Sequence, residues 1–446
     1  MSENGRKLTP INIRTNPDLA RFKLWLAKKI EKSLPQHESE TRNDATIQLV
    51  KERFQMAKSR AKVNIPPELE DQFLRELIDE ILGFGPLEEI LKDDSVTEVM
   101  VNRADLTFVE RSGKLGVDDN IIFNDDAHVE RIIRKIILPL GRTVGSENPL
   151  VDARLPDGSR VNAVIAPCAI DGPNITIRKF SKTPFGIQDL INFGSLNETM
   201  AEFLEAVVVS KLNVIVSGGT GSGKTTLLNV LSSFIPDGER IVTIEDAAEL
   251  SLQQRHVVRL ETKKPAKPGD SEVSIRDLVI NSLRMRPERI VVGECRGGEA
   301  LDMLQAMNTG HDGSLTTIHA NNPRDTISRL ETLVLMAGMD LPLSVVRKQI
   351  VSAVDMIVQQ SRLRDGSRKI INITEIAGME GDTVVMQDLF RFEERGEDDG
   401  KVIGEYVPGG MRPACEDRLK IHGFNFPPAV FMPSSSGRSG GYGRRR

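Results

Sequence analysis

The chain has 446 residues, of which 39% are apolar and 4% aromatic, and its formal net charge at pH 7 is −5. This length is sufficient for two or three buried cores, and the scarcity of aromatic residues predicts that Leu, Ile, Val, Met and Ala fill them. The acidic balance argues against a protein that coats nucleic acid through charge alone. The composition therefore predicts a multidomain globular protein.

Cys168, Cys295 and Cys415 are isolated, with no C-x-x-C pair. They predict neither a disulfide framework nor a cysteine zinc site, and they are typical of a reducing cytoplasm. No apolar run approaches the roughly 18 residues of a membrane span, and the N-terminus lacks the apolar core of a secretory signal. We expect a cytoplasmic protein whose membrane role, if any, is exerted at the surface or through partners.

Residues 1–68 are predicted to be a basic, partly disordered helical appendage. Lys and Arg outnumber Asp and Glu between residues 6 and 62. Apolar residues recur at helical spacing around Trp25 and Phe54, and a third stripe surrounds Leu77 before a GFGP stop signal. Three helices could form a small bundle or only decorate the next domain, and both interpretations stay open.

The pattern changes to strands in residues 69–180, which are predicted to form an α+β domain. VTEVMVN and LTFVERSGKL indicate one hairpin, and the DG of ARLPDGSRVNAVIA marks the turn of a second. A helix from His128 to Leu140 is predicted between them. Residues 181–197 contain turn-forming punctuation and are predicted to be a linker.

Residues 198–430 alternate between strands and helices, which predicts a parallel sheet with both faces covered. The predicted strands are NVIVSG, RIVTIED, HVVRLE, RIVVGE and SLTTIHA. Acidic residues between Glu393 and Asp399 predict a solvated hairpin tip. Residues 431–446 are rich in Gly, Ser and Arg and are predicted to be a disordered tail. The predicted fold class is α/β, with a P-loop NTPase core.

A phosphate-binding pattern begins this domain. GGTGSGKT satisfies G-x-x-x-x-G-K-[ST], between an apolar strand and the helical stretch TLLNVLSSFI. Glycines let backbone N–H groups curl around phosphate oxygens, Lys224 supplies a flexible cation to the β and γ phosphates, and Thr225 supplies a hydroxyl to Mg²⁺. The predicted nucleotide-binding residues are Gly218, Gly219, Thr220, Gly221, Ser222, Gly223, Lys224, Thr225 and Thr226.

Three other polar residues also follow predicted strands, namely Glu245, Glu294 and His319. Each alone could be a helix cap, a packing residue or a surface residue. Because ligands gather at the carboxyl ends of strands in an open α/β sheet, we expect these side chains to meet the P-loop at one edge. In IVVGECR, however, Gly293 stands where a nucleotide motor usually has an aspartate that helps to hold magnesium. The carboxylate for the metal must come from elsewhere.

Four motifs together resemble a known family. The P-loop, TIED, GE-R and GHDGSLTTIHAN occur in the order and spacing of the secretion-superfamily ATPases that drive type II and type IV secretion, type IV pili and archaella. DGSRVNAVIAP, NITIRKF and GFGPLEEIL most closely resemble the Tad (Flp pilus) motor ATPases, called CpaF. The type II branch often carries a four-cysteine metal insert, which three isolated cysteines cannot form, so no zinc is expected.

The resemblance implies a RecA-like core and roles for individual residues. Glu294 corresponds to the catalytic carboxylate of an atypical Walker B motif. Glu245 is similar to an acid that supports Mg²⁺ or the attacking water, and we expect it to join Thr225 at the metal. His311 and His319 match the histidine box. Arginines of the N-terminal domain are expected to meet the phosphates, although ordinary surface or ion-pair roles are the alternative; the candidates are Arg154, Arg160 and Arg178, with Arg178 favoured.

The resemblance also implies an assembly and a task. We expect a homohexamer, peripheral at the inner membrane, that hydrolyses ATP with Mg²⁺ and acts through polytopic platform proteins to assemble, and possibly retract, Tad pili. A conjugation-type secretion ATPase is the alternative. A nucleic-acid motor is disfavoured by the acidic charge and scarce aromatics, so no sequence-specific nucleic acid is expected. A scaffold without hydrolysis is disfavoured because Lys224, Thr225, Glu245 and Glu294 are all present.

Overall fold

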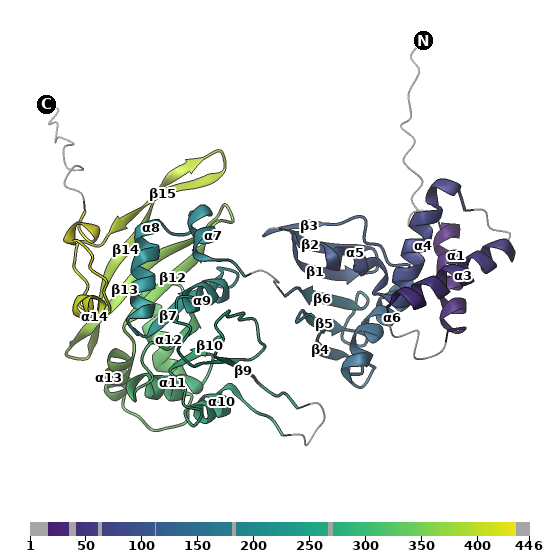
Figure 1. The fold of residues 1–446 in the computed structure, drawn as a ribbon. Helices are drawn as coiled ribbons and strands as arrows, with labels where there is room; N and C mark the ends of the chain where they lie inside the picture. Colours follow the sequence, from purple (N-terminus) through teal and green to yellow (C-terminus); the bar gives the residue numbers. More distant parts are fainter. Residues whose placement is uncertain are drawn as a thin grey trace, which may run out of the picture. The chain divides into compact units, whose positions relative to one another are not determined.

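The structure, a computed structural model, describes residues 17–34, 42–60, 65–111, 113–180, 184–265 and 271–433. The chain divides into two compact units, Met1–Ser181 and Lys182–Arg446, and each is described by itself (Figure 1). Within the described ranges, no helix is both long enough and apolar enough to cross a membrane.

The first unit begins with a bundle of three helices, α1 (Pro17–Glu31), α3 (Asp44–Arg60) and α4 (Pro67–Leu82). Their apolar stripes share one core, in which Leu26, Phe54 and Phe73 are fully buried. The rings of Phe54 and Phe73 stack with centroids 5.8 Å apart. The three predicted helices are confirmed, and they form a bundle with its own core.

The bundle is followed by a six-stranded antiparallel sheet with strand order β3-β2-β1-β6-β5-β4. The elements are α5 (Glu88–Lys92), β1 (Val96–Arg103), β2 (Leu106–Arg111), β3 (Lys114–Val117), α6 (Asp126–Ile137), β4 (Leu150–Arg154), β5 (Arg160–Val164) and β6 (Asn174–Arg178). Helix α6 packs Ile132 and Ile133 against buried strand residues such as Val99. Both predicted hairpins are confirmed. The predicted helix also forms, with a 3₁₀ turn, Leu138–Leu140, as its last part.

The second unit is built on a nine-stranded sheet with order β15-β14-β13-β12-β7-β11-β10-β8-β9. Its strands are β7 (Val214–Gly218), β8 (Ile241–Glu245), β9 (Val257–Glu261), β10 (Arg289–Val292), β11 (Leu315–His319), β12 (Met356–Arg362), β13 (Arg368–Glu380), β14 (Thr383–Asp398) and β15 (Lys401–Pro408). The six from β12 to β9 are parallel, and β13, β14 and β15 extend the sheet antiparallel. The five predicted strands all form within the parallel part.

Helices cover both faces of this sheet. They are α7 (Ile187–Asn192), α8 (Glu198–Val209), α9 (Lys224–Ser232), α10 (Ile275–Ser282), α11 (Glu299–Asn308), α12 (Pro323–Leu335), α13 (Leu343–Ala353) and α14 (Glu416–Ile421). Val214 and Val216 pack with α8 and α9, whereas Ile215 packs with the core of α10 to α13. Burial on both faces explains why the central strands are continuously apolar. The fold is thus α/β, as predicted.

The segment that enters the second unit is bonded to the β13 end of the sheet. Ile370 N donates to Ser195 O at 2.9 Å, and Lys369 Nζ donates to Gly194 O at 2.6 Å. Tyr406, on β15, donates its hydroxyl to Ser195 O at 2.6 Å, and Ser195 Oγ donates to Arg368 O at 2.7 Å. Gly194 and Ser195 are therefore bonded to the first residues of β13, which precede the part of that strand that pairs with β14.

Two predicted segments differ in extent from the structure. The stretch predicted as a linker, residues 181–197, contains helix α7. Leu190 of this helix and Leu196 after it are buried in the core of the second unit. The predicted disordered tail begins at Phe431, but that ring is 1% exposed and lies 5.6 Å from the ring of Phe203. Apolar side chains placed among turn residues explain both differences. Residues 434–446 of the predicted tail lie outside the described residues.

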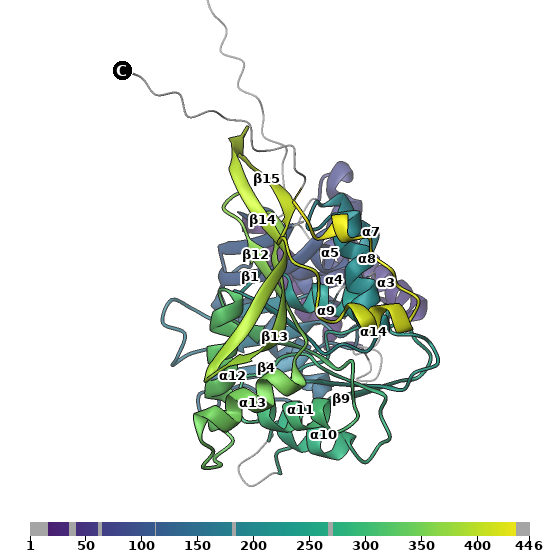
Figure 2. The ribbon, with the colours of Figure 1, turned by 90° about the vertical axis from the view of Figure 1, so that its left-hand side faces the viewer.

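The acidic segment lies at the far end of the β14–β15 hairpin, as predicted. The two long strands, yellow-green in Figure 2, run beyond the layer of helices. Arg364 donates to Glu397 at 2.9 Å and also pairs with Glu394. Exposed charges along such a ribbon protect its edge from pairing with another strand.

Arg289, at the start of β10, is buried completely. Its Nε lies 2.5 Å from Glu239 Oε2, and its Nη1 donates to Val208 O at 2.9 Å and to Gly313 O at 3.1 Å. Because breaking such a buried pair removes the guanidinium donors from the Glu239 carboxylate and from two backbone carbonyls, the replacement of Arg289 is costly.

We therefore expect Arg289→Met to lower the free energy of unfolding of the second unit by about 3–5 kcal/mol. The measurement is urea unfolding followed by circular dichroism at an unchanged m-value. Arg284→Met is the matched control, because Arg284 is exposed and its guanidinium donates to Ile280 O on the protein surface; its change should stay within about 0.5 kcal/mol. Equal midpoints for the two variants would contradict the role given to Arg289.

Candidate nucleotide site

The loop between β7 and α9 requires glycine at several positions. Gly221 and Gly223 have φ of 70° and 96°. A Cβ on Gly218 would lie 2.3 Å from Gln360 O, whereas one on Gly219 would meet no atom within 4 Å. The loop is therefore tightly packed against the end of β12 at its start and open above Gly219. This is the form expected of a phosphate-binding loop.

Helix α9 presents unpaired backbone donors next to this opening. Its N-cap residue is Gly223, which provides no side-chain cap, and the first intrahelical bond is donated by Leu227 N to Gly223 O at 2.9 Å. The N–H groups of the first turn precede that bond and have no i−4 acceptor within the helix. Together with the helix dipole they favour an anion at this end.

Lys224 is held within the loop. Its side chain is largely buried, and Nζ donates to Gly219 O at 2.9 Å and lies 3.3 Å from His319 Nε2. Burial lowers the pKa of Lys224, and Arg296 lowers it further, whereas Glu294 opposes the shift. A second anion close to Lys224, in addition to Glu294, would therefore stabilise its charged form.

Glu294 follows β10 and lies between two basic side chains. Arg296 Nη2 donates to Glu294 Oε2 at 2.6 Å, and His319 Nε2 lies 3.0 Å from Glu294 Oε1. The second contact is a close approach without hydrogen-bond alignment, so Oε1 has no hydrogen-bond donor among the described residues. Burial, followed by the charge of Lys224, lowers the pKa of His319, and Glu294 partly offsets this. A single nitrogen of His319 thus faces both Lys224 and Glu294.

Glu245, the last residue of β8, occupies the space next to Gly293. A Cβ on Gly293 would lie 2.9 Å from Glu245 Cγ. The carboxylate of Glu245 accepts at Oε1 from Glu249 N at 2.8 Å and from Leu250 N at 3.0 Å. Gly293 is therefore required by the position of Glu245, and an aspartate there would collide with it.

The remaining oxygen of Glu245 tests whether the site fits a metal ion. Glu245 is 3% exposed, and its buried Oε2 has no hydrogen-bond partner in the part of the chain that the structure describes. Burial raises the pKa of Glu245, although the two backbone N–H groups lower it. An orphaned carboxylate oxygen at the nucleotide edge fits Mg²⁺ or a water bound to it. Asp246 is already engaged, because Thr262 Oγ1 donates to it at 2.9 Å.

Two arginines and a glutamine at this edge had no predicted role. Arg296 contacts Glu294. Its position two residues after Glu294 was the only feature of the sequence that could have indicated this contact. Arg368, the first residue of β13, donates from Nε to Gly221 O at 3.0 Å. Gln360 is 2% exposed and underlies the loop, since a Cβ on Gly223 would lie 3.3 Å from its Nε2. Strands β12 and β13 were not among the predicted strands, so these residues had no predicted place.

His311 does not join this site within its own chain. It precedes β11, and Ser314, which donates to His311 O at 2.8 Å, also accepts from Ile290 N near the start of β10. His319 ends the same five-residue strand, so the two histidines lie at opposite ends of β11, whose four steps of about 3.3 Å span about 13 Å. Of the predicted histidine pair, only His319 is brought to the P-loop.

The three predicted arginines of the first unit form a row. Arg154 pairs in register with Arg160, and Arg160 pairs with Arg178 across β4, β5 and β6. Residues directly opposite in an antiparallel pair point to the same face, so the three guanidinium side chains start from one face of the sheet. Val161 and Ala163 of β5 face the α6 core, so the arginines occupy the other face.

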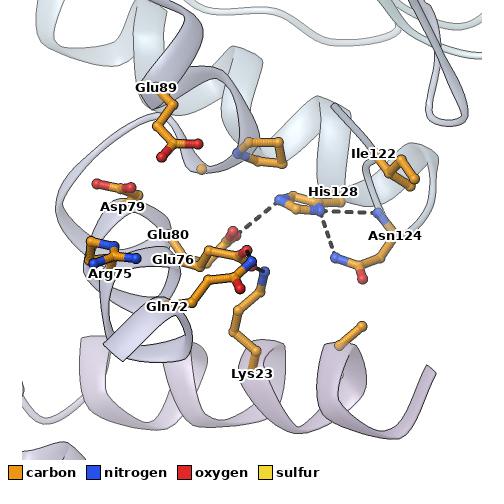
Figure 3. Close-up of a pocket in the computed structure, with 13 residues that line it drawn as sticks. Lys23, Gln72, Arg75, Glu76, Asp79, Glu80, Glu89, Ile122, Asn124 and His128 are labelled. Atoms are coloured by element: carbon orange, nitrogen blue, oxygen red, sulfur yellow. Dashed lines mark hydrogen bonds and ion pairs between the residues drawn. The ribbon is translucent and has the colours of Figure 1, made fainter. Parts of the chain in front are cut away.

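The first unit also contains a polar cavity of about 150 Å³ between α1, α4 and α6 (Figure 3). Lys23 lies 2.5 Å from Glu76, and His128 Nε2 lies 3.0 Å from Glu80 Oε1. Burial lowers the pKa of His128 to about 4. The pairs Lys23–Glu76 and His128–Glu80 each connect two different helices, so these contacts join α1, α4 and α6.

The chain was compared with known proteins. A family model described as type II/IV secretion system protein matches residues 80–388. An uncharacterized protein of Methanocaldococcus jannaschii is 49% identical over 239 residues, which are 52% of this chain and 33% of that protein. A putative conjugal transfer protein of Mycobacterium tuberculosis is 36% identical over 314 residues, 69% of this chain and 88% of that protein. The match thus spans one third of the archaeal protein's length.

A solved structure is similar as well. The crystal structure of the VirB11 ATPase from the Brucella suis type IV secretion system, in complex with sulphate, is 31% identical with a TM-score of 0.36. The match covers 65% of this chain and 94% of that chain.

The contact between Gly293 and Glu245 can be tested by substitution. We expect Gly293→Ala to lower the free energy of unfolding by about 1–3 kcal/mol, because the new methyl group forces Glu245 away from its two N–H donors. In a Glu245→Ala background the same change should cost less. Gly219→Ala is the control, since a Cβ there meets open space. Additive effects of Gly293→Ala and Glu245→Ala in chemical unfolding would refute the contact.

The raised pKa of Glu245 predicts a pH dependence. The folded chain binds the Glu245 proton more tightly than the unfolded chain, so this carboxyl destabilises the fold as pH rises from its ordinary value of 4.5 through the raised pKa. Glu245→Gln removes this loss, and the variant should gain stability relative to the wild type as the pH rises above 4.5 through the raised pKa. Thermal unfolding across that range measures it. The exposed Glu272→Gln is the matched control in the same measurement.

Proposed function

Because the chain belongs to the family of type II/IV secretion system proteins, we propose that it hydrolyses ATP with Mg²⁺ to drive a secretion or pilus-assembly machine. The observation that carries the proposal is that the P-loop, Lys224, Glu245 and Glu294 lie at the carboxyl edge of one parallel sheet. A P-loop alone binds nucleotide, whereas a carboxylate beside it can act on a water molecule.

The P-loop and the first turn of α9 would bind the phosphates. The first-turn N–H groups and the open space above Gly219 would receive the β phosphate, and Lys224 would extend to the β and γ oxygens. Thr225 and Glu245 would hold Mg²⁺, directly or through water. When bound, Mg²⁺ supplies positive charge to the phosphate oxygens. The second carboxylate oxygen of Glu245 is free for this purpose, because its first oxygen is already bonded to backbone.

Hydrolysis requires a water in line with the γ phosphate. Glu294 is the candidate base, because it follows the strand next to β11 and lies 3.0 Å from His319, which lies 3.3 Å from Lys224. A γ phosphate carries more charge than one carboxylate and would draw Lys224 and Arg296 toward itself. Glu294 would then be released to orient the water and accept its proton. His319 would respond to the movement of Lys224 and Glu294, because its Nε2 lies close to both side chains.

The arginine row of the first unit would supply the remaining charge. Arg154, Arg160 and Arg178 are brought into register by β4, β5 and β6, and such a row suits a polyphosphate. We propose that the first unit closes over the nucleotide, with Arg178 in contact, and that hydrolysis reopens it. In a homohexamer this cycle would be repeated around the ring. His311, at the opposite edge of the sheet, has no part in it within its own chain.

The cargo is the finer part of the proposal. We propose assembly of Tad/Flp pili, with retraction as the alternative direction, by a cytoplasmic ring at the inner membrane that acts on polytopic platform proteins. The motifs DGSRVNAVIAP and NITIRKF support it. A conjugation-type role is the second candidate, favoured by the identity of 36% to a putative conjugal transfer protein. A pull-down with cytoplasmic loops of platform proteins from each system separates them, and failure with pilus platforms would remove the Tad assignment.

Substitution of Glu294 tests the chemistry. We expect Glu294→Gln to retain binding of a fluorescent ATP analogue and to lower kcat by about 10²-fold or more, because general-base catalysis is lost. Lys224→Ala should weaken both binding and turnover. The exposed Glu272→Gln serves as the control in the same phosphate-release assay. Wild-type kcat in Glu294→Gln would exclude Glu294 as the base. Stimulation of the wild-type rate by single-stranded DNA would favour a nucleic-acid motor instead.

A further inference from the structure

The outward face of α1 joins cations to the chain's only tryptophan. The exposed residues of this face are Arg21, Trp25, Lys28, Lys29 and Lys32. At 100° per residue they fall within a sector about 100° wide. Lys32 follows the last helical residue, and its N–H still donates to Lys28 O at 3.2 Å. We call these five residues the α1 face.

Trp25 is unusually placed for so large an apolar ring. Its side chain is 52% exposed, and it stacks on Phe22 with centroids 5.9 Å apart and an interplanar angle of 20°. Lys29 Nζ lies over the indole at 4.7 Å from the centroid. An indole has an apolar ring body and a polar N–H. At a boundary between water and an apolar layer, the ring body can be buried while the N–H and the neighbouring ammonium groups stay hydrated.

The inward face of α1 is already used within the unit. Leu26, Ala27 and Ile30 are buried in the bundle core. Lys23 points into the cavity of Figure 3, where its Nζ lies 2.5 Å from Glu76 Oε2. The helix is therefore formed and anchored without the α1 face. Ordering of the helix adds no cost when a partner binds that face.

We propose that the α1 face docks on an anionic phospholipid bilayer. Such a surface attracts Lys and Arg through its headgroup phosphates and offers an interfacial layer in which an indole ring can insert. The chain as a whole has a net charge of −5, so the same surface repels the remainder of the protein and orients the α1 face toward it. This inference depends on the proposed function only for its purpose, which is to bring a motor to a membrane-embedded machine.

Other anionic partners match only part of this face. Single-stranded nucleic acid would supply phosphates, but one ring with one neighbouring phenyl group offers few positions on which bases can stack. An acidic protein segment would supply carboxylates without an apolar boundary. The bilayer accounts for the cations and the exposed indole together.

The lone tryptophan makes the proposal measurable in the full-length protein without nucleotide. Vesicles of phosphatidylcholine with about 30% phosphatidylglycerol should shift the Trp25 emission to shorter wavelength and protect it from iodide quenching. Pure phosphatidylcholine vesicles should do neither. About 0.5 M NaCl should reverse the association, because screening removes the attraction between exposed charges and the surface.

Substitutions then test the face by vesicle co-sedimentation. We expect Lys28→Glu with Lys32→Glu to raise the lipid concentration for half-maximal binding at least tenfold. Lys348→Glu with Lys401→Glu introduces the same change of charge at exposed positions of the second unit and should leave binding within about twofold. Trp25→Ala should weaken binding while retaining its salt dependence. Circular dichroism establishes that each variant is folded.

Several results would overturn the proposal. One is a Trp25 emission that does not respond to anionic vesicles, and another is an equal loss of vesicle binding in the two double variants. A Trp25 emission that shifts with protein concentration alone would assign the α1 face to contact between copies of the chain. A larger response to single-stranded DNA than to vesicles at equal phosphate would assign it to nucleic acid. ATPase activity measured without lipid tests the proposed function separately, since none of these substitutions lies at the nucleotide site.

Discussion

The packing of Glu245 against Gly293 determines the arrangement of the whole nucleotide edge. Two adjacent parallel strands end there, and only one side chain fits in the space between them. Glu245 fills it, bonded through one oxygen to the backbone of Glu249 and Leu250. In the proposed function, Glu245 on the first strand would supply the carboxylate that a nucleotide motor usually places on the second strand. Glu294 would then be left for the γ-phosphate side of the site.

The ionisable groups of this edge share a property when no nucleotide is bound. Burial shifts the pKa values of Lys224, His319 and Glu245 toward their neutral forms. Each group would gain from the opposite charge that ATP and Mg²⁺ together bring. Under the proposed function, the edge would thus suit a ligand that carries both signs of charge.

The amino-acid sequence predicts the parallel sheet, the P-loop and the acids at strand ends well, because these depend on local pattern and on the common direction of the strands. It does not predict contacts made by segments far apart in the chain. Arg368 reaches the P-loop from β13, and no local signal marks it. The sequence placed His311 before a strand and His319 at its end, and the resemblance gave both a role at the phosphates; within its own chain only His319 lies beside the P-loop. Phe431 was assigned to a tail because its burial depends on Phe203, more than two hundred residues away.

The bonds around the start of β13 have a mechanical consequence. Gly194 and Ser195, where the chain enters the second unit, are attached to Lys369, Ile370 and Tyr406. The neighbouring Arg368 holds the carbonyl of Gly221 in the P-loop. Tension on the connection from the first unit would therefore reach the phosphate loop through a single strand end. In the proposed cycle, closure of the first unit would be coupled to the phosphate loop through these few hydrogen bonds.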